Sequence, residues 1–265
     1  MWDLYRAIMD YCYEQDPEAM IIFCGDACDR GPDGYRIMKE LLDNPYVVYL
    51  KGNHEDMFTK AAREIKQMFN FENTDRDRVK TVLSACRNFD YKYAAIQDSL
   101  YNGGMPTLLD WIMDGMPMDF VERIEQLPLT LSTDTCDFCH SGGLYNTFKR
   151  VADCEYEGLP INSWDNEAIL WNRSALDIGW TPNRIAIFGH TPTPYLSDYI
   201  DVQVDEIQPI KYAPTSNPVY TGEKLDMDTG AVFTGRTFVL NVLTMKAQGF
   251  ELKDNQVEKI EVIQF

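Results

Sequence analysis

Residues 25–31 (GDACDRG), directly after the apolar run 20–24, carry the side chains with the clearest chemical use. Asp26 offers a hard carboxylate oxygen to a metal ion, and Arg30 offers a planar fork of donors that fits a phosphate group. Loops at the ends of strands in α/β proteins converge on one crevice, so this position suits a binding site. A polar turn with a surface ion pair is the alternative. The motif predicts a phosphate site built around a metal.

A second polar motif, residues 52–55 (GNHE), also follows an apolar run. Asn53 offers a neutral carbonyl ligand to a metal, and His54 can act as a general acid near neutral pH. An asparagine that caps a helix is the structural alternative. A helix and a strand fit between the two motifs, and this spacing predicts a β-α-β unit.

The chain contains three histidines, His54, His140 and His190, and each follows an apolar run at the start of a polar turn. A single histidine in such a place is more often a turn residue than a ligand. Three imidazoles together with Asp26 and Asn53 form a mixed nitrogen and oxygen set that suits manganese, iron or zinc. The pattern as a whole therefore favours a metal centre.

Seven cysteines lie scattered through apolar runs, which suits a reducing compartment where free cysteine packs as a small apolar side chain. Residues 136–140 (CDFCH) match the spacing of c-type haem attachment. Haem attachment requires export, and residues 1–16 have neither the basic start nor the cleavage site of a secretion signal. A zinc site would need further ligands at matching spacing. A strand that ends at His140 explains the pattern better.

The formal net charge of −18 argues against nucleic acid as a partner, because phosphate backbones select basic surfaces. A phosphate substrate stays possible, since a bound cation can reverse the field inside one cleft. No run approaches the roughly 18 consecutive apolar residues of a membrane helix. We expect a soluble, cytoplasmic protein that binds neither nucleic acid nor membrane. The sequence does not indicate an oligomeric state.

Hydrophobic periodicity predicts an alternation of strands and helices in the first half of the chain. We expect helices at 3–14 and 35–43 and buried strands at 20–24 and 46–50. Residues 56–127 are predicted to be mainly helical, with breaks at residues 102–104 and 115 and a last helix that begins at Pro117.

The second half is predicted to contain more strand. We expect strands at 129–133, 136–140 and 184–188, a short helix near 166–172, and antiparallel strands at 231–244, 249–253 and 257–265 with turns at 235 and 254–255. Residues 144–165 are expected to be irregular, and 197–224, rich in proline, to form a long loop or irregular hairpin. No repeat or low-complexity linker interrupts the chain, so residues 1–265 are expected to form a single domain.

With these motifs in order, the sequence resembles the metal-dependent phosphoprotein phosphatases. It is most similar to the small bacterial and phage type, such as the bacteriophage lambda enzyme, and to diadenosine tetraphosphatases. The likeness covers most of the chain and follows the order of residues 25–31 (GDACDRG), 52–55 (GNHE), 102–104 (NGG), 139–143 (CHSGG), 170–173 (LWNR), 188–193 (FGHTPT) and 228–231 (DTGA). It implies an α/β fold in which a central β-sandwich of mixed sheets is flanked by helices, with metals at the loops along one edge.

The resemblance also implies the metal ligands. Asp26 would bridge two divalent metals, and Asn53, His140 and His190 would complete the shell of the second. Manganese is the expected metal, with iron or zinc as alternatives. Two ions would occupy the intact family site.

Catalytic roles follow from the same resemblance. His54 would protonate the leaving alkoxide, held and polarised by Asp29, while Arg30 and Arg173 would grip the phosphate oxygens. A surface arginine on a helix is the alternative for Arg173. We expect the turns at residues 102–104 and 228–230 to be structural.

Members of this family begin with a strand that ends in Gly-Asp-x-His-Gly, whose Asp and His hold the first metal, and the 265 residues contain no such motif. With the residues present, the second metal keeps four protein ligands and the first keeps only Asp26. Since losing one electrostatic contact to a transition state typically costs about 10²–10³ in rate, we expect the chain as it stands to be weakly active or inactive. Its sheet would also have an unpaired edge. Translation from a start codon upstream of Met1 is the simplest explanation, and a degenerate phosphatase is the other.

The predicted function is metal-dependent hydrolysis of phosphomonoesters by in-line attack of a metal-bound hydroxide. Phosphoserine and phosphothreonine in proteins are the expected substrates, and a small phosphoester is also possible. Hydrolysis of dinucleoside polyphosphates such as diadenosine tetraphosphate is the enzymatic alternative. A non-catalytic phosphate-binding or regulatory module is the alternative from another class.

Overall fold

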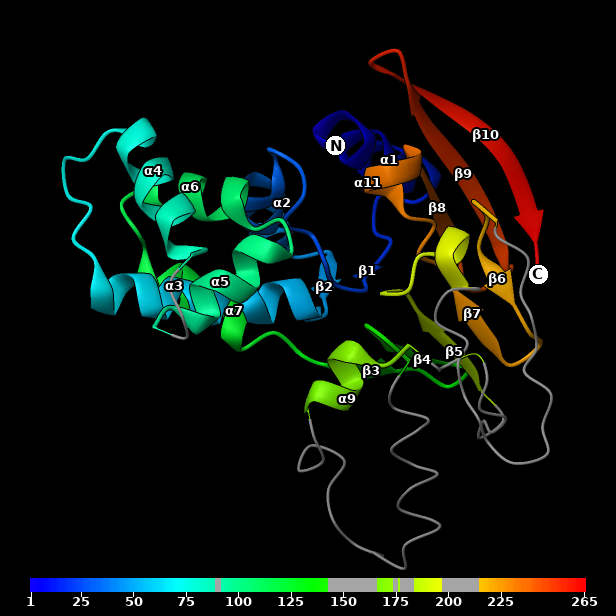
Figure 1. Cartoon of the computed structure of the whole chain (residues 1–265). Coiled ribbons are helices and arrows are strands. Elements are labelled where there is room, and N and C mark those ends of the chain that lie inside the picture. The colour runs from blue at the N-terminus through cyan, green and yellow to red at the C-terminus, as the bar shows by residue number, and fades with distance from the viewer. Residues whose placement is uncertain (89–91, 143–165, 174–175, 177–183, 197–214) are drawn as a thin grey trace, which may run out of the picture. The chain divides into compact units, whose positions relative to one another are not determined.

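The computed structural model describes residues 1–88, 92–142, 166–173, 176, 184–196 and 215–265 (Figure 1). The chain divides into two compact units. The first unit comprises residues 1–2 and 18–128, and the second comprises residues 3–17 and 129–265. The expectation of a single domain stays a prediction, and each unit is described by itself below.

The first unit contains the predicted β-α-β arrangement. Strand β1 (Ile21–Phe23), helix α2 (Gly34–Asp43) and strand β2 (Val47–Tyr49) follow one another, and the two strands pair in parallel. Their carboxyl ends therefore lie at the same edge, where residues 25–31 and 52–55 begin. β1 was expected to be buried, but all three of its residues are only partly buried.

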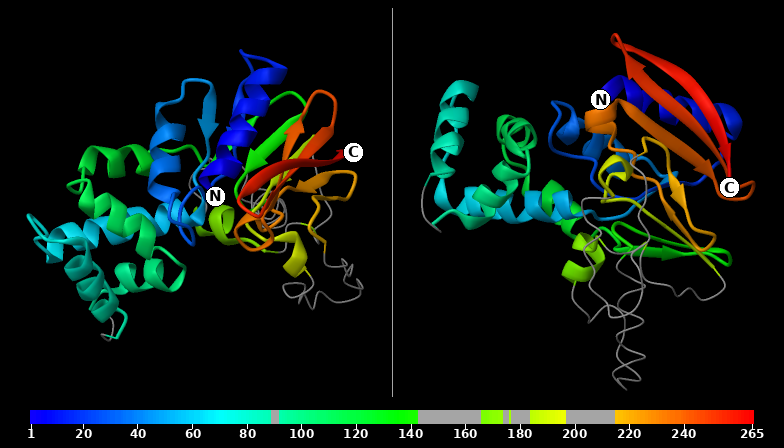
Figure 2. Two further views of the ribbon diagram at one scale, coloured as in Figure 1. Left: turned by 90° about the horizontal axis from the view of Figure 1, so that it is seen from above. Right: turned by 45° about the vertical axis from the view of Figure 1, so that its right-hand side comes forward.

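Among the described residues, five helices form the rest of the first unit (Figures 1 and 2): α3 (Asn53–Met68), α4 (Arg76–Cys86), α5 (Ala94–Tyr101), α6 (Met105–Met113) and α7 (Met118–Glu125). The predicted breaks at residues 102–104 and 115 are confirmed. At the centre, the ring of Phe58 packs edge-on against Trp111 and Phe120. Pro117 precedes α7 instead of beginning it, and its carbonyl accepts a hydrogen bond from the Trp111 indole at 3.2 Å.

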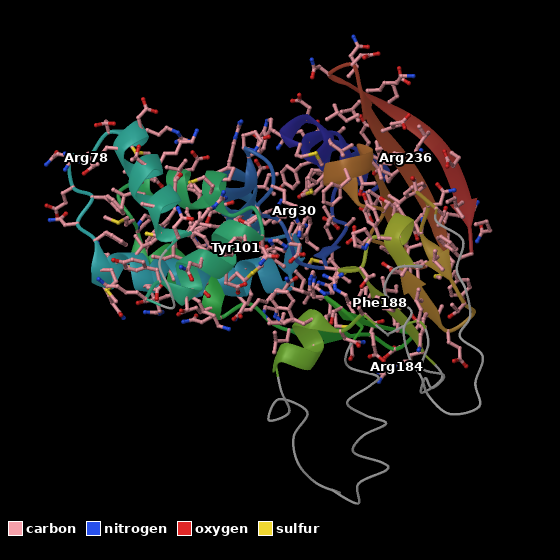
Figure 3. All side chains as sticks on the ribbon, in the orientation of Figure 1. Arg30, Arg78, Tyr101, Arg184, Phe188 and Arg236 are labelled. Atoms are coloured by element: carbon pink, nitrogen blue, oxygen red, sulfur yellow. The ribbon has the colours of Figure 1, made fainter. Side chains whose placement is uncertain are left out.

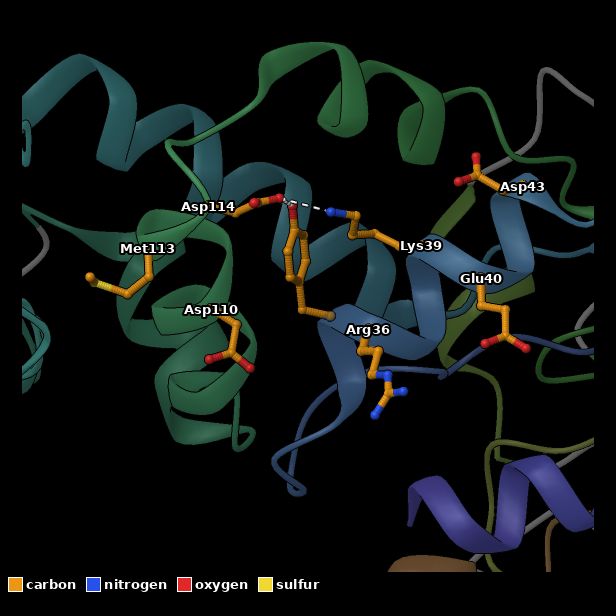
Figure 4. Close-up of a pocket in the computed structure, with 8 residues that line it drawn as sticks. Arg36, Lys39, Glu40, Asp43, Asp110, Met113 and Asp114 are labelled. Atoms are coloured by element: carbon orange, nitrogen blue, oxygen red, sulfur yellow. Dashed lines mark hydrogen bonds and ion pairs between the residues drawn. The ribbon is translucent and has the colours of Figure 1, made fainter.

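A groove of 520 Å³ lies between α2 and α6 in the first unit (Figure 4). Within it, the Tyr35 hydroxyl and the Lys39 ammonium both donate to the Asp114 carboxylate, at 2.7 and 2.9 Å. None of the site residues predicted from the sequence lines this groove.

The second unit contains a mixed five-stranded sheet in the order β3-β4-β5-β7-β6: β3 (Thr130–Ser132), β4 (Cys136–Cys139), β5 (Ile185–Phe188), β6 (Val219–Tyr220) and β7 (Lys224–Asp226). The central strands β4, β5 and β7 are parallel, and the two edge strands are antiparallel to their neighbours. Helix α9 (Asn166–Trp171) contributes Ile169 to an apolar cluster with Cys139, Ala186, Phe188 and Leu196. The carboxyl ends of β4 and β5 consequently bring His140 and His190 to one edge.

The second unit also contains a three-stranded antiparallel sheet: β8 (Arg236–Asn241), β9 (Lys246–Lys253) and β10 (Gln256–Gln264). Helix α1 (Trp2–Gln15) packs against it (Figures 1 and 2), with the Tyr11 ring 5.4 Å from that of Phe250 and the Lys259 ammonium 3.7 Å from the Glu14 carboxylate. Arg236, labelled in Figure 3, joins the three strands through Glu251 and Glu261.

The strand predicted at 231–244 is wrong at both ends. Residues Ala231–Thr234 form a short helix, α11, which ends at Gly235 with a φ of 71° that glycine adopts readily. β8 then stops at Asn241, whose side chain accepts hydrogen bonds from the backbone of Leu243 and Thr244 and so closes a turn. β9 begins at Lys246, before the predicted position 249.

The α/β class is confirmed, with one mixed five-stranded sheet flanked by helices. That the sheets form a β-sandwich stays a prediction. β6 pairs with β7 as a short antiparallel hairpin at the carboxyl end of the predicted region 197–224, and β7 extends beyond it to Asp226. Residues 197–214 and the predicted irregular stretch 144–165 lie outside the described residues. In the described part of the chain, no helix is both long and apolar enough to cross a membrane. A cytoplasmic location stays a prediction.

Candidate active site

The loop between β1 and α2 has a strained backbone. Asp26, Asp29 and Arg30 have φ values of 60°, 71° and 59°, and His190, in the second unit, has a φ of 74°. This left-handed conformation costs an L-residue roughly 1–2 kcal/mol because Cβ approaches the next carbonyl oxygen. Such strain concentrates at functional sites, where the surrounding structure holds it. All four residues belong to the predicted site.

Glu55 holds the first half of this loop, a role that the sequence reasoning missed. Its carboxylate is fully buried and accepts backbone hydrogen bonds from Asp26, Ala27 and Gly52, each at 2.8 Å, and one from the Tyr49 hydroxyl at 2.7 Å. Burial, followed by the nearby Glu55 charge, raises the pKa of Tyr49 well above its usual range. One available signal was a Glu three residues after a helix N-cap, the capping-box position.

Asp26 and Asn53 lie on neighbouring loops of the first unit. The Asp26 Oδ1 accepts a hydrogen bond from the backbone N–H of His54 at 3.1 Å, at the start of α3. Asn53 is the first residue of that helix and is 2% exposed. Both predicted ligands therefore come from the carboxyl ends of the parallel strands.

His54 lies between the Asp29 carboxylate and the Arg30 guanidinium in the first unit. Its Nδ1 is 2.7 Å from the Asp29 Oδ2, and its Nε2 is 2.9 Å from an Arg30 guanidinium nitrogen. Burial alone would lower the pKa of His54, but the charges of Asp26 and Asp29 and the hydrogen bond to Asp29 outweigh it, so the pKa is raised above its ordinary value. Because a guanidinium can only donate, His54 Nε2 accepts the Arg30 N–H here, while Nδ1 donates its proton to Asp29. The raised pKa favours a second proton on Nε2, the proton that a general acid gives, once Arg30 donates elsewhere.

In the second unit, His140 and His190 direct ring nitrogens at each other. The His140 Nε2 and the His190 Nδ1 are 3.1 Å apart, and both residues are buried. Two nitrogen ligands bonded at about 2.1 Å to one metal ion and meeting at a right angle lie about 3 Å apart. This pair of donors therefore fits the metal that the sequence predicts.

Arg173 lies beside these histidines. Its guanidinium donates to the His190 carbonyl at 3.4 Å, and the ring of Trp171 packs edge-on 5.9 Å from the His190 ring. The Ser141 Oγ accepts a hydrogen bond from the backbone N–H of Asn172 at 3.1 Å, and this bond ties the end of α9 to the end of β4. The Arg173 guanidinium is therefore held near His140 and His190, as an arginine that binds the phosphate would need to be.

The turn at Asp228 has the structural role that was expected. Its carboxylate accepts the backbone N–H of Gly230 at 2.9 Å, and its carbonyl accepts that of Thr193 at 2.7 Å. A Cβ on Gly189 would lie 3.3 Å from the Asp228 Cβ, so this turn packs closely on the loop that carries His190.

A family model described as calcineurin-like phosphoesterase matches residues 1–210. The chain belongs to this family. Its members are phosphoester hydrolases that use divalent metals, which agrees with the mixed nitrogen and oxygen donors described above. A search of curated proteins found no match.

In this phosphoesterase, residues 136–140 (CDFCH) belong to β4 and the turn that follows it. Cys136 and Cys139 are buried on β4, and His140 follows the end of that strand. This arrangement agrees with the prediction of a strand that ends at a functional histidine.

The structure brings the predicted residues of this phosphoesterase together in two sets. Asp26, Asp29, Arg30, Asn53 and His54 meet in the first unit, and His140, Arg173 and His190 meet in the second. That the two sets act on one metal and one phosphate stays a prediction.

Proposed function

We propose that this phosphoesterase hydrolyses phosphomonoesters of alkyl alcohols, with phosphoserine and phosphothreonine in proteins as its substrates. The observation that carries the proposal is the position of His54 between Asp29 and Arg30. An alkoxide is a poor leaving group that needs a proton. Cleavage of a dinucleoside polyphosphate instead releases a nucleotide, which is a stable anion and needs no proton. A buried imidazole arranged to hold a proton therefore favours an alkyl monoester.

Arg30 supports the same proposal. Its guanidinium contacts His54 Nε2 and is itself exposed, so it can also donate to a phosphoryl group from solvent. If a phosphate oxygen replaced His54 Nε2 as the acceptor of the Arg30 N–H, Nε2 would be free to carry a proton beside the ester oxygen. Asp29 keeps the imidazole oriented and balances its positive charge.

We propose that one divalent cation binds Asp26, Asn53, His140 and His190. The support is the chemistry of the four donors and the 3.1 Å separation of the two ring nitrogens. When bound, the cation would supply an activated water and offset the charge of the phosphoryl group. Arg173, fixed at the His190 carbonyl, would add a second positive group for the phosphate.

Parallel turnover of a phosphoserine peptide and diadenosine tetraphosphate, each with Mn²⁺, tests the substrate. We expect slow turnover by the full chain, because its residues provide one complete metal site, and we expect the peptide to be the better substrate. A clear preference for the dinucleotide would replace this proposal with the polyphosphate reaction. Binding of Mn²⁺ and phosphate without turnover of either compound would replace it with the regulatory reading.

Metal content measured by plasma spectrometry tests the ligand set. Asp26→Asn and His190→Ala, one from each unit, should both lower the bound metal. His54→Gln is the matched control, since this imidazole contacts Asp29 and Arg30 and should leave metal content unchanged. Full occupancy in either ligand variant would remove that residue from the set.

A further inference from the structure

The loop of residues 25–31 is held at two separate places. Glu55 binds the backbone of Asp26 and Ala27, as described above. The strained pair Asp29 and Arg30 lies beyond its reach and is held by another part of the first unit. Because L-residues adopt positive φ only where the surroundings enforce it, the second anchor must be specific.

That second anchor is formed by Gly103 and Thr107, at the start of α6. The backbone N–H of Arg30 donates to the Gly103 carbonyl at 3.0 Å. The backbone N–H of Asp29 donates to the Thr107 hydroxyl at 3.0 Å. Both left-handed residues thus have their amide groups satisfied by one short segment.

The anchor fits closely against the loop. Gly103 has a φ of 95°, and a Cβ on it would lie 2.8 Å from the Arg30 Cγ. Thr107 is 1% exposed, and a Cβ on Gly34 would lie 3.1 Å from its hydroxyl oxygen. Since its surroundings leave the Thr107 hydroxyl little room to move, it can fix the position of the Asp29 amide.

We propose that Thr107 is a positioning residue that sets the phosphate affinity of the site. Its hydroxyl, together with the Gly103 carbonyl, holds the backbone that aims Asp29 at His54 and places the Arg30 guanidinium. The inference rests on the proposed function, because Arg30 must be a phosphate ligand. Glu55 holds Asp26, the proposed metal ligand, and Thr107 holds the segment that carries Arg30, the proposed phosphate ligand. The metal affinity and the phosphate affinity should therefore be separable.

Calorimetric titration of the full chain tests this separation. Inorganic phosphate is titrated into the Mn²⁺-saturated protein, and Mn²⁺ is titrated into the metal-free protein. Thr107→Val should weaken phosphate binding about tenfold, the usual effect of one buried hydrogen bond, with Mn²⁺ affinity unchanged. Thr107→Ser keeps the hydroxyl and should retain phosphate affinity.

Thr59→Val is the matched control. Thr59 is also buried in the first unit, and its hydroxyl donates to the Asp56 carbonyl within α3. The same loss of a hydroxyl there should change neither affinity. If Thr107→Val fails to fold, Thr107→Ala and Thr107→Ser form the deciding pair, with loss of phosphate affinity expected only in the alanine variant.

Wild-type phosphate affinity in the Thr107→Val or Thr107→Ala protein would overturn the inference while leaving the proposed function intact. A parallel loss of Mn²⁺ affinity would also overturn it, because it would indicate general damage to the unit. A wild-type chain that binds Mn²⁺ but not phosphate would overturn both the inference and the phosphatase proposal.

Discussion

A methyl group on Gly52 would lie 2.2 Å from the Asp26 Oδ1 and 2.6 Å from the Glu55 Oε2. The Asp26 carboxylate therefore occupies the space that any side chain at position 52 would fill, so its position requires a glycine there. Through this contact, the loop after β2 sets the position of a predicted metal ligand on the loop after β1.

Gly52→Ala should displace Asp26 and weaken Mn²⁺ binding, and overpacking of this kind should destabilise the first unit by about 1–3 kcal/mol. Gly31→Ala, in the same loop as Asp26, is the control, because a Cβ there would meet only ordinary contact with the Met1 side chain at 3.6 Å. Calorimetry with Mn²⁺ and thermal unfolding measure both effects. Equal behaviour of the two variants would contradict the close fit.

Glu55→Gln should weaken Mn²⁺ binding and lower stability by about 1.5–3 kcal/mol, because an amide nitrogen would replace one acceptor of a buried charged network. Three backbone donors and the Tyr49 hydroxyl converge on that carboxylate. Urea unfolding and a Mn²⁺ titration test this. The exposed Glu72→Gln serves as control, and a Glu55 variant indistinguishable from it would show that the carboxylate is not the anchor.

Asp29→Asn should slow hydrolysis of an alkyl phosphate by about 10²–10⁴, the range of general acid catalysis. The amide cannot balance the charge of a protonated His54 ring 2.7 Å away. p-Nitrophenyl phosphate should lose much less, since its leaving group needs no proton. Steady-state turnover of both esters provides the comparison, and equal losses would remove His54 as the proton donor.

Asp226→Asn should stabilise the second unit at neutral pH. Asp226 is fully buried, its Oδ2 has no hydrogen-bond partner among the described residues, and burial followed by the charge of Asp228 raises its pKa well above the usual range. The native state therefore keeps a proton that the unfolded chain releases above about pH 3.9, so native stability falls as pH rises towards the folded pKa.

The Asp226→Asn variant lacks this titration and can still accept the Asp228 N–H through its amide oxygen. We expect the free energy of unfolding of the variant to exceed that of the native protein by about 1–3 kcal/mol at pH 7. The difference should vanish near pH 4. Urea unfolding across this pH range measures the curve. Asp10→Asn, at an exposed position, controls for the loss of a carboxylate, and a pH-independent difference at position 226 would contradict the argument.

The sequence predicted those parts of the fold that depend on local pattern. Apolar runs closed by glycine marked β1 and β2, and helical periodicity marked α1 and α2, because burial of one face imposes those periods. The helix at 231–234 was missed because Val232 and Phe233 favour strands by propensity, while the flanking glycines at positive φ impose a helical turn.

The candidate site shows a similar division. Asp26, Asn53 and the histidines were found because their chemistry is visible in the residue type. Glu55 and Thr107 were not assigned, because each acts through the backbone of residues that are distant in the chain. The capping-box position marks the bond of Glu55 to Gly52, but the bonds of Glu55 to Asp26 and Ala27 and of Thr107 to Asp29 leave no local pattern. Only the folded arrangement of the loops identifies them.

The packing of α1 against β9 has a consequence for biosynthesis. α1 ends at Gln15 and β9 begins at Lys246, so the helix is translated long before its partner strand exists. Throughout that interval the Tyr11 ring of the helix lacks the Phe250 ring against which it packs in the finished protein. The second unit must close late, through contacts of very high sequence separation, and chaperones would have their longest opportunity to bind the nascent chain at this helix.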